Sequence, residues 1–255
     1  MPVKFSAGEL SKTFDNGLRA LGGVSFSLHE REFLCLLGPS GCGKTTLLKI
    51  LAGLLAPSSG KIAAPPTAGP RPSFGLLFQD LALFPWKTVR QNVELGLKFQ
   101  GQPRPHVKKA ADLQIKNMRL GGFEDYYPHQ LSGGMKQRVA LARLLACAPE
   151  VMLMDEPLGA LDAGMRRLLQ GELLEAWEKD RTTAILVTHS IEEALLLGDR
   201  VLVFSARPGR IKAELKVPFV RPRSLDIVNS PEFAALSKTL WRLLEEEIRL
   251  AEAAG

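Results

Sequence analysis

The stretch Glu32-Phe-Leu-Cys-Leu-Leu-Gly38-Pro-Ser-Gly-Cys-Gly-Lys44-Thr45 decides the expected fold. Its first half is a short apolar run that ends on glycine, which predicts a buried strand. From Lys44 onward the apolar residues recur at the spacing of one helix face. These residues are Leu47, Leu48, Leu51 and Leu54. The order of strand, glycine loop and helix predicts an α/β unit with an anion site at the start of the helix.

The glycine loop has the composition of a phosphate-binding loop, because four residues separate Gly38 from Gly-Lys-Thr. Glycines let successive backbone N–H groups curl around phosphate oxygens, and the next helix adds its positive N-terminus. Lys44 can reach the β- and γ-phosphates, and the Thr45 hydroxyl can ligate magnesium. A plain glycine-rich turn is the alternative, which the position between strand and helix disfavours. The predicted nucleotide-binding residues here are Gly38, Pro39, Ser40, Gly41, Cys42, Gly43, Lys44, Thr45 and Thr46.

Two more apolar runs end on polar residues that could complete this site. Residues 151–154 precede Asp155 and Glu156, and residues 184–187 precede Thr188 and His189. Unbroken apolar runs are typical of a parallel sheet that is covered on both faces.

The polar residues after these runs have distinct chemical uses. Asp155 can hold magnesium, while Glu156 can orient and deprotonate an attacking water. In isolation such a pair is more often the start of a solvated loop. His189 could donate a hydrogen bond to a γ-phosphate, although a lone histidine at a strand end is usually structural. The amide of Gln79 could contact magnesium or the water, but an isolated glutamine carries little information.

Composition limits the class of protein. The chain has 255 residues, of which 45% are hydrophobic and 24% charged, as in ordinary globular proteins. Its apolar stretches are far shorter than the roughly 20 residues that span a bilayer. The first residues lack the pattern of a secretion signal. We therefore expect action in the cytosol.

Charge and cysteine content are less informative. A net charge of +6 suits an anionic partner, either nucleic acid or the inner membrane surface. The basic residues between 98 and 119 are better explained as a solvated helical face. Three cysteines without ligand spacing predict free thiols. Because Cys42 lies in the glycine loop, alkylation of its thiol is expected to inhibit, with protection by ATP.

The pattern becomes helical between Thr88 and Ala146. Thr88 and Gln91 form a capping box at the start. One apolar stripe then continues until Gly121-Gly122, which we expect to end its helix. The stripe consists of Val107, Ala111, Ile115 and Met118. We expect a helical subdomain at residues 87–146.

The rest of the chain divides around this insertion. Residues 1–86 and 147–216 are expected to form the α/β core, and residues 217–255 a C-terminal extension. The high content of Pro, Ala and Gly in residues 61–73 predicts a loop or a weak edge hairpin. In the extension, Ser230 and Pro231 begin a helix whose apolar side is expected to pack on its own domain.

The segment Leu131-Ser-Gly-Gly-Met-Lys-Gln-Arg138 closely resembles the signature motif of the ATP-binding-cassette (ABC) ATPases. It precedes Asp155, as that family requires. By its chemistry, Ser132 is a good N-cap and the two glycines expose backbone amides. A well-capped helix without further role is the alternative. The residues matched to the signature are Leu131, Ser132, Gly133, Gly134 and Met135.

This resemblance covers roughly residues 3–216 and implies a fold and a mechanism. The implied fold is a P-loop NTPase core with a parallel-rich sheet, an N-terminal antiparallel β region and an inserted helical subdomain. Two subunits would pair head to tail, so that each signature completes the site for ATP and Mg²⁺ of its partner. Closure on binding and opening after hydrolysis would move attached membrane subunits.

The resemblance also assigns individual residues. Gln79 matches the Q-loop glutamine, which reaches the metal and the water, and His189 matches the switch histidine. Residues 158–162, with Leu161 and Asp162, match the D-loop. Phe14 stands where the family stacks an aromatic ring, commonly tyrosine, on adenine. Phenylalanine keeps the stacking and lacks the hydroxyl.

Two segments resemble the nitrate, sulfonate and taurine importer group within the family. They are Leu83-Phe-Pro-Trp-Lys-Thr-Val and residues 192–210. This resemblance implies a peripheral subunit on the cytoplasmic face of the inner membrane. Its partners would be a second copy or a homologous ATPase, integral membrane permease subunits and, indirectly, a periplasmic or extracellular solute-binding protein, with no nucleic acid. Trp86 would contact a permease coupling helix or lie in the core.

Three other functions compete with import. An ABC protein that acts on ribosomes or DNA typically has two cassettes or a long coiled coil, and this sequence shows neither. An efflux subunit would differ in needing no binding protein. A nucleotide-binding scaffold without turnover is disfavoured by the presence of Glu156.

Overall fold

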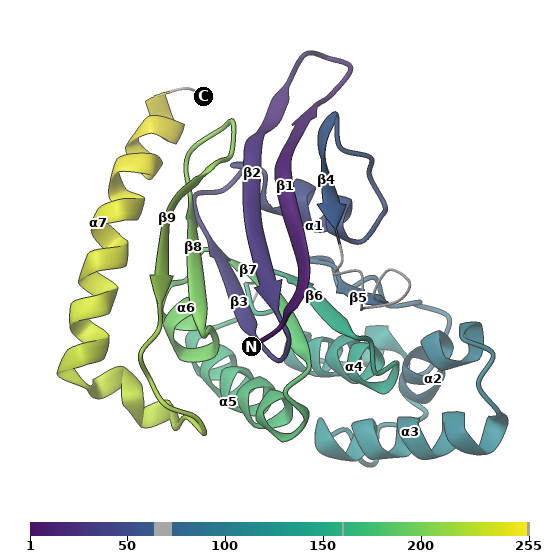
Figure 1. The fold of residues 1–255 in the computed structure, drawn as a ribbon. Coiled ribbons are helices and arrows are strands. Elements are labelled where there is room, and N and C mark those ends of the chain that lie inside the picture. Colours follow the sequence, from purple (N-terminus) through teal and green to yellow (C-terminus); the bar gives the residue numbers. More distant parts are fainter. Residues whose placement is uncertain (64–72, 160, 254–255) are drawn as a thin grey trace.

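The computed structural model describes residues 1–63, 73–159 and 161–253 of the chain, and Figure 1 shows their arrangement. A smaller antiparallel sheet lies at the N-terminal side. Its strands are β1 (Val3–Thr13), β2 (Arg19–His29) and β4 (Ser59–Ala63), in the order β2-β1-β4. Of the loop predicted at 61–73, residues 61–63 thus complete an edge strand, and residues 64–72 lie outside the described part.

The larger sheet has six strands in the order β5-β6-β7-β3-β8-β9. The first five run parallel, and β9 is antiparallel to β8. The strands are β3 (Phe33–Leu37), β5 (Phe74–Leu77), β6 (Val151–Asp155), β7 (Thr183–Thr188), β8 (Arg200–Phe204) and β9 (Ile211–Lys216).

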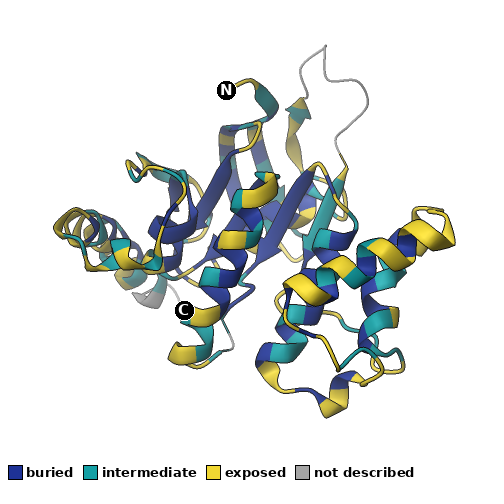
Figure 2. Cartoon of the chain, turned by 90° about the horizontal axis from the view of Figure 1, so that it is seen from below, coloured by how far each residue is buried: buried dark blue, intermediate teal, exposed yellow. Residues whose placement is uncertain are grey.

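The central strands are buried along their whole length. Every residue of β3, β6 and β7 is buried, and Figure 2 shows these strands in dark blue between the helices. Apolar runs without alternation are what a parallel sheet with two covered faces requires. The predicted α/β class and the three predicted buried strands are therefore confirmed.

Helix α1 (Lys44–Leu51) follows the glycine loop, as predicted, but it is shorter than its apolar stripe. Gly53 adopts a φ of 76°, in the left-handed region that ends helices. Leu54 consequently lies beyond the helix with 62% of its surface exposed. Its assignment to the buried face was wrong.

Three helices lie together beside the β5 edge of the larger sheet (Figure 1). They are α2 (Val89–Phe99), α3 (Arg104–Asn117) and α4 (Gly133–Ala146), and a 3₁₀ turn, Pro128–Gln130, precedes α4. The capping box of Thr88 and Gln91 is confirmed. The division of the chain into subdomains stays a prediction.

Helix α3 has the expected buried stripe and a different end. Val107, Ala111, Ile115 and Met118 are all buried. The helix stops at Asn117, before the two glycines, because Arg119 takes a φ of 52° that reverses the chain. The prediction that Gly121-Gly122 ends it was wrong.

The remaining helices are α5 (Ala163–Asp180), α6 (Ile191–Leu197) and α7 (Pro231–Ala253), with a 3₁₀ turn at Leu225–Asn229. Ser230 Oγ accepts a hydrogen bond from Phe233 N at 3.2 Å, which caps α7. Phe233, Leu240 and Leu244 belong to the same hydrophobic cluster as α6, so α7 packs on its own chain as expected. In Figure 1 it runs along β9. Within the described residues, none of the helices has the length and apolarity to cross a membrane.

Candidate functional site

The sheet brings the predicted site residues to one edge. Strands β6, β7 and β3 are parallel neighbours, so their carboxyl ends lie side by side. Gly38 follows β3, Glu156 follows β6 and His189 follows β7. Ligands of open parallel sheets bind at this edge.

Backbone geometry explains the glycines of the loop at residues 38–45. Gly41 and Gly43 have φ values of 74° and 105°, a region that residues with a Cβ rarely adopt. A Cβ on Gly43 would also lie 2.6 Å from Ala20 O. The loop therefore needs glycine there both for its curvature and for its contact with β2.

Lys44 occupies the inside of the loop. Its Nζ donates hydrogen bonds to Gly38 O and Pro39 O, each at 2.8 Å. The residue is only 4% exposed. Together with a contact to Cys42 Sγ at 3.5 Å, these bonds hold the ammonium group beside any anion that the loop binds.

Thr45 and Asp155 form a pair suited to a divalent cation. Thr45 Oγ1 donates to Asp155 Oδ1 at 3.1 Å. Burial raises the pKa of Asp155 above its ordinary value; Glu156 adds to this, while the Thr45 hydroxyl and Lys44 oppose it. Hydroxyl and carboxylate oxygens are Mg²⁺ ligands, and a cation would relieve the cost of this buried charge. The residues fit magnesium.

Three candidate catalytic side chains meet at one oxygen. Glu156 Oε2 lies 3.3 Å from His189 Nδ1 and 3.5 Å from Gln79 Nε2. Glu156 itself has a φ of 46°, which costs a non-glycine residue on the order of 1–3 kcal/mol. The bond from Glu156 N to Val187 O, 3.0 Å long, holds that conformation. Sequence alone gives no signal for this backbone strain.

A cavity of about 330 Å³ opens between these groups and the antiparallel sheet. Phe14, after β1, lies at one end, with Lys12 Nζ 5.5 Å from its ring centroid. The predicted residues on its wall are Phe14, Ser40, Gly41, Gly43, Lys44, Thr45, Thr46, Gln79 and Glu156. Leu18, Ala20 and Arg207 also line it. Leu18 and Ala20 belong to no motif, and Arg207 lies in the segment 192–210, whose resemblance assigns it no role at the site.

The signature residues lie outside the cavity of the glycine loop. Ser132 Oγ caps α4 by accepting from Met135 N at 3.3 Å, and none of the residues 131–135 lines the cavity just described. A Cβ on Gly134 would meet Met165 Sδ at 2.8 Å, and Asp162 Oδ1 accepts from Met165 N. The first turns of α4 and α5 are thus in contact, which places the signature beside the D-loop segment.

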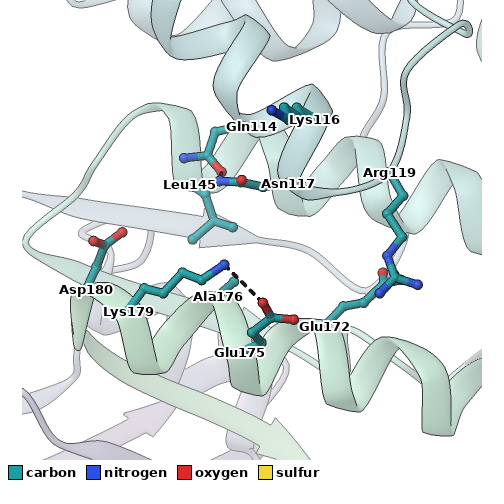
Figure 3. A pocket seen from close by; sticks show the side chains of 10 residues that line it. All are labelled: Gln114, Lys116, Asn117, Arg119, Leu145, Glu172, Glu175, Ala176, Lys179 and Asp180. Atoms are coloured by element: carbon teal, nitrogen blue, oxygen red, sulfur yellow. Dashed lines mark hydrogen bonds and ion pairs between the residues drawn. The ribbon is translucent and has the colours of Figure 1, made fainter.

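A bidentate ion pair joins α4, the helix that begins at the signature, to α5. Arg138 Nε and Nη2 each donate to Glu172 at 3.0 Å, and the Glu172 carboxylate is buried. Arg119, after α3, approaches the same carboxylate with Nε at 3.5 Å. Figure 3 shows Arg119 and Glu172 at one end of a cleft of about 250 Å³. The orientation of α4 is therefore tied to the α/β part through charged groups.

The structure gives the exposure of Cys42 and Trp86. Cys42 is 1% exposed, and burial raises the pKa of its thiol, which lowers the thiolate fraction. Inhibition by alkylation stays a prediction, and the burial of Cys42 should make its modification slow. Trp86 is 69% exposed and packs edge-on against Phe84, so the core position among its two predicted positions is wrong. As expected, the three cysteines are free thiols.

The turn at the end of the importer-like segment 192–210 supports the glycine loop from outside. Gly209, between β8 and β9, donates from its N to Ala20 O at 2.9 Å. A Cβ on Gly209 would lie 2.1 Å from Cys42 O, a backbone atom of the loop. The close approach leaves no room for any side chain.

We expect Gly209→Ala to lower stability by about 1–3 kcal/mol, because the loop must move to admit the methyl group. Nucleotide affinity should fall with it. Gly121→Ala is the matched control, since a Cβ there would meet no atom within 4 Å. Thermal melting and nucleotide titration of both variants measure the effect, and equal melting temperatures would contradict the packing argument.

The fold and the glycine loop together define the class of P-loop ATPases. The signature motif narrows the choice of family within that class. The chain matches the family model described as ABC transporter over residues 21–159, more than half of its length. It belongs to the ABC transporter family, as an ATP-binding subunit. The resemblance seen in the signature motif is thereby confirmed.

Relatives and solved structures agree with this assignment. An uncharacterized ABC transporter ATP-binding protein of Methanocaldococcus jannaschii is 47% identical, over 97% of this chain and 94% of that protein. The taurine import ATP-binding protein TauB of Ruegeria pomeroyi is 50% identical, over 84% and 82%. A dimeric bacterial ABC transporter cassette superposes with a TM-score of 0.74 at 32% identity, covering 85% of this chain and all of that one, and it is also known in a post-hydrolysis state bound to ADP and Pi.

Proposed function

We propose that this chain hydrolyses ATP as the energising subunit of an ABC importer for a small solute of the class of nitrate, sulfonate, taurine or a related anion. The observation that carries the hydrolytic part is the convergence of Gln79 and His189 on Glu156 Oε2, beside the cavity of the glycine loop. The taurine importer subunits among the relatives support import.

In the proposed site, different residues bind the phosphates, the adenine and Mg²⁺ of the bound nucleotide. Backbone N–H groups of residues 38–46 and the N-terminus of α1 would hold the phosphates, with Lys44 at the β- and γ-phosphates. Phe14 would stack on adenine. Thr45, Asp155 and the Gln79 amide would hold Mg²⁺, which when bound neutralises phosphate charge.

Hydrolysis in this proposal needs a base and an orienting partner. Glu156 would accept the proton of the attacking water as that water forms a bond to the γ-phosphorus, while the bond from this phosphorus to the β–γ bridging oxygen breaks and ADP leaves. His189, 3.3 Å from Glu156, and Gln79 would fix the carboxylate and the water. The strained backbone of Glu156 would keep its side chain aimed into the cavity.

The signature supports a paired arrangement. Residues 131–135 do not line the cavity of their own chain, and Ser132, Gly133 and Gly134 offer backbone amides at the start of α4. We propose that they complete the ATP site of a second copy or a homologous ATPase, with Leu161 and Asp162 of the D-loop beside them. Permease subunits would hold the pair at the cytoplasmic face of the inner membrane, where the exposed Trp86 fits a coupling contact. A solute-binding protein would act through them, and no nucleic acid is involved.

The proposal is tested by reconstituting the chain with its permease in liposomes. We expect Mg²⁺-dependent ATP hydrolysis that rises when the loaded solute-binding protein is added, together with solute uptake. Hydrolysis that is indifferent to the binding protein, with solute moving outward, would identify an efflux subunit instead. Failure to associate with any permease would favour a non-transport ABC ATPase.

A further inference from the structure

The C-terminal helix reaches the glycine loop through the β8–β9 turn, residues 205–210. Besides the contact of Gly209, Ser205 N donates to Arg210 O at 2.9 Å, and Gly22 N donates to Gly209 O at 3.0 Å. These bonds fix the turn between the two sheets. The backbone from which Arg207 reaches the loop is therefore fixed.

Arg207 is the charged side chain of this turn that lines the nucleotide cavity. Its Nε and Nη2 donate to Gly41 O at 3.1 Å and 2.9 Å. A guanidinium group has five N–H donors, so most of them remain for another acceptor. Within the described part of the chain Arg207 makes no ion pair. A fixed positive charge with free donors thus lies next to the loop.

Glu247 of α7 holds the turn from the other side. Its Oε2 accepts from Ala206 N at 2.6 Å, and its Oε1 lies 2.8 Å from Lys212 Nζ. Glu247 is only 6% exposed. Burial raises its pKa, but the bonds from Lys212 and Ala206 outweigh burial and hold the pKa below its ordinary range. The carboxylate is therefore ionised at neutral pH, and it holds Ala206, the residue before Arg207, by a hydrogen bond.

We propose that Arg207 donates to a phosphate oxygen of the bound nucleotide, and that Glu247 on α7 positions Arg207 for this contact. The inference rests on the proposed function, since it adds a residue to the same ATP site. Phosphate is the expected acceptor because Arg207 is anchored on Gly41, inside the loop, whereas the adenine is expected at Phe14. Guanidinium groups bind phosphate through paired N–H donors.

The first experiment measures binding of a fluorescent ATP analogue to variants of the turn. Arg207→Ala is expected to raise the dissociation constant about tenfold, and Arg207→Lys to raise it less because the charge remains. The KM for ATP should rise in step with the dissociation constant, because the lost contact is made to the bound nucleotide. Should Arg207→Ala lose cooperative melting, Arg207→Gln takes its place.

Arg210→Ala is the matched control. It removes the same charge from the same turn, and Arg210 does not line the cavity. Its dissociation constant should equal that of the wild type. Wild-type affinity in Arg207→Ala would overturn the inference alone, whereas a wild-type protein that binds no ATP would overturn the proposed function as well.

A double-mutant cycle tests the part played by α7. Glu247→Gln should raise the dissociation constant about threefold by weakening the charge-assisted bond to Ala206 N. Added to Arg207→Ala it should cause no further loss, because both changes act through one contact. Glu245→Gln, on an exposed face of the same helix, should have no effect. Additive losses in the double variant would show that Glu247 does not act through Arg207.

Discussion

Glu156→Gln is expected to abolish steady-state ATP hydrolysis, by about 1,000-fold or more, while ATP still binds. The substitution keeps the shape of the side chain and removes the group that would accept the proton of the attacking water; such bases contribute about 10²–10⁴ in rate. ATP that is bound and not hydrolysed should accumulate a dimer of the chain. Phosphate release, equilibrium ATP binding and size-exclusion chromatography with ATP measure the three effects.

Glu175→Gln provides the control for this experiment. Among the described residues Glu175 pairs with Lys179 on the surface of α5, and it does not line the cavity of the glycine loop. Its turnover should match that of the wild type. Hydrolysis by Glu156→Gln at the wild-type rate would remove Glu156 from the mechanism and reopen the choice of base between the neighbouring side chains.

Lys44→Ala is expected to weaken nucleotide binding itself, roughly 100-fold. The variant removes the buried positive charge that faces the phosphates, and it leaves Gly38 O and Pro39 O without their donor. The loss of these hydrogen bonds within the loop should lower the nucleotide affinity further than the loss of charge alone. Titration with a fluorescent ATP analogue measures the affinity.

Lys49→Ala is the control for Lys44→Ala, because it removes the same charge from an exposed position of α1. It should leave affinity unchanged. ATP binding by Lys44→Ala with the affinity of the wild type would contradict the assignment of the loop as the phosphate site. Together with Glu156→Gln, the variant separates binding from hydrolysis.

Local patterns predicted much of the fold. The buried strands were predicted from contiguous apolar runs. The capping box before α2, the cap of α7 and the N-cap at Ser132 follow from hydrogen bonds between residues close in sequence. Errors occurred where one backbone angle decided the outcome. Arg119 reverses the chain without being glycine, and α1 ends at Leu51, just before the left-handed Gly53, although the apolar spacing continues to Leu54.

Exposure was less predictable than secondary structure. The position of Cys42 within the loop follows from sequence, whereas its burial depends on packing around a loop that residues 205–210 cover. Trp86 is a second case, since sequence left both a core position and a surface contact open and the structure shows it at the surface. Neither result has a local signal.

The sequence by itself determined the class of this protein, because the loop of residues 38–45 and the signature are contiguous motifs whose chemistry lies in neighbouring residues. Only the tertiary structure decided which distant groups share the site. Arg207 meets Gly41 across 166 positions, and Glu247 meets Ala206 across 41. Such contacts depend on the order of strands and on helix packing, which bring residues together without any periodicity in the chain.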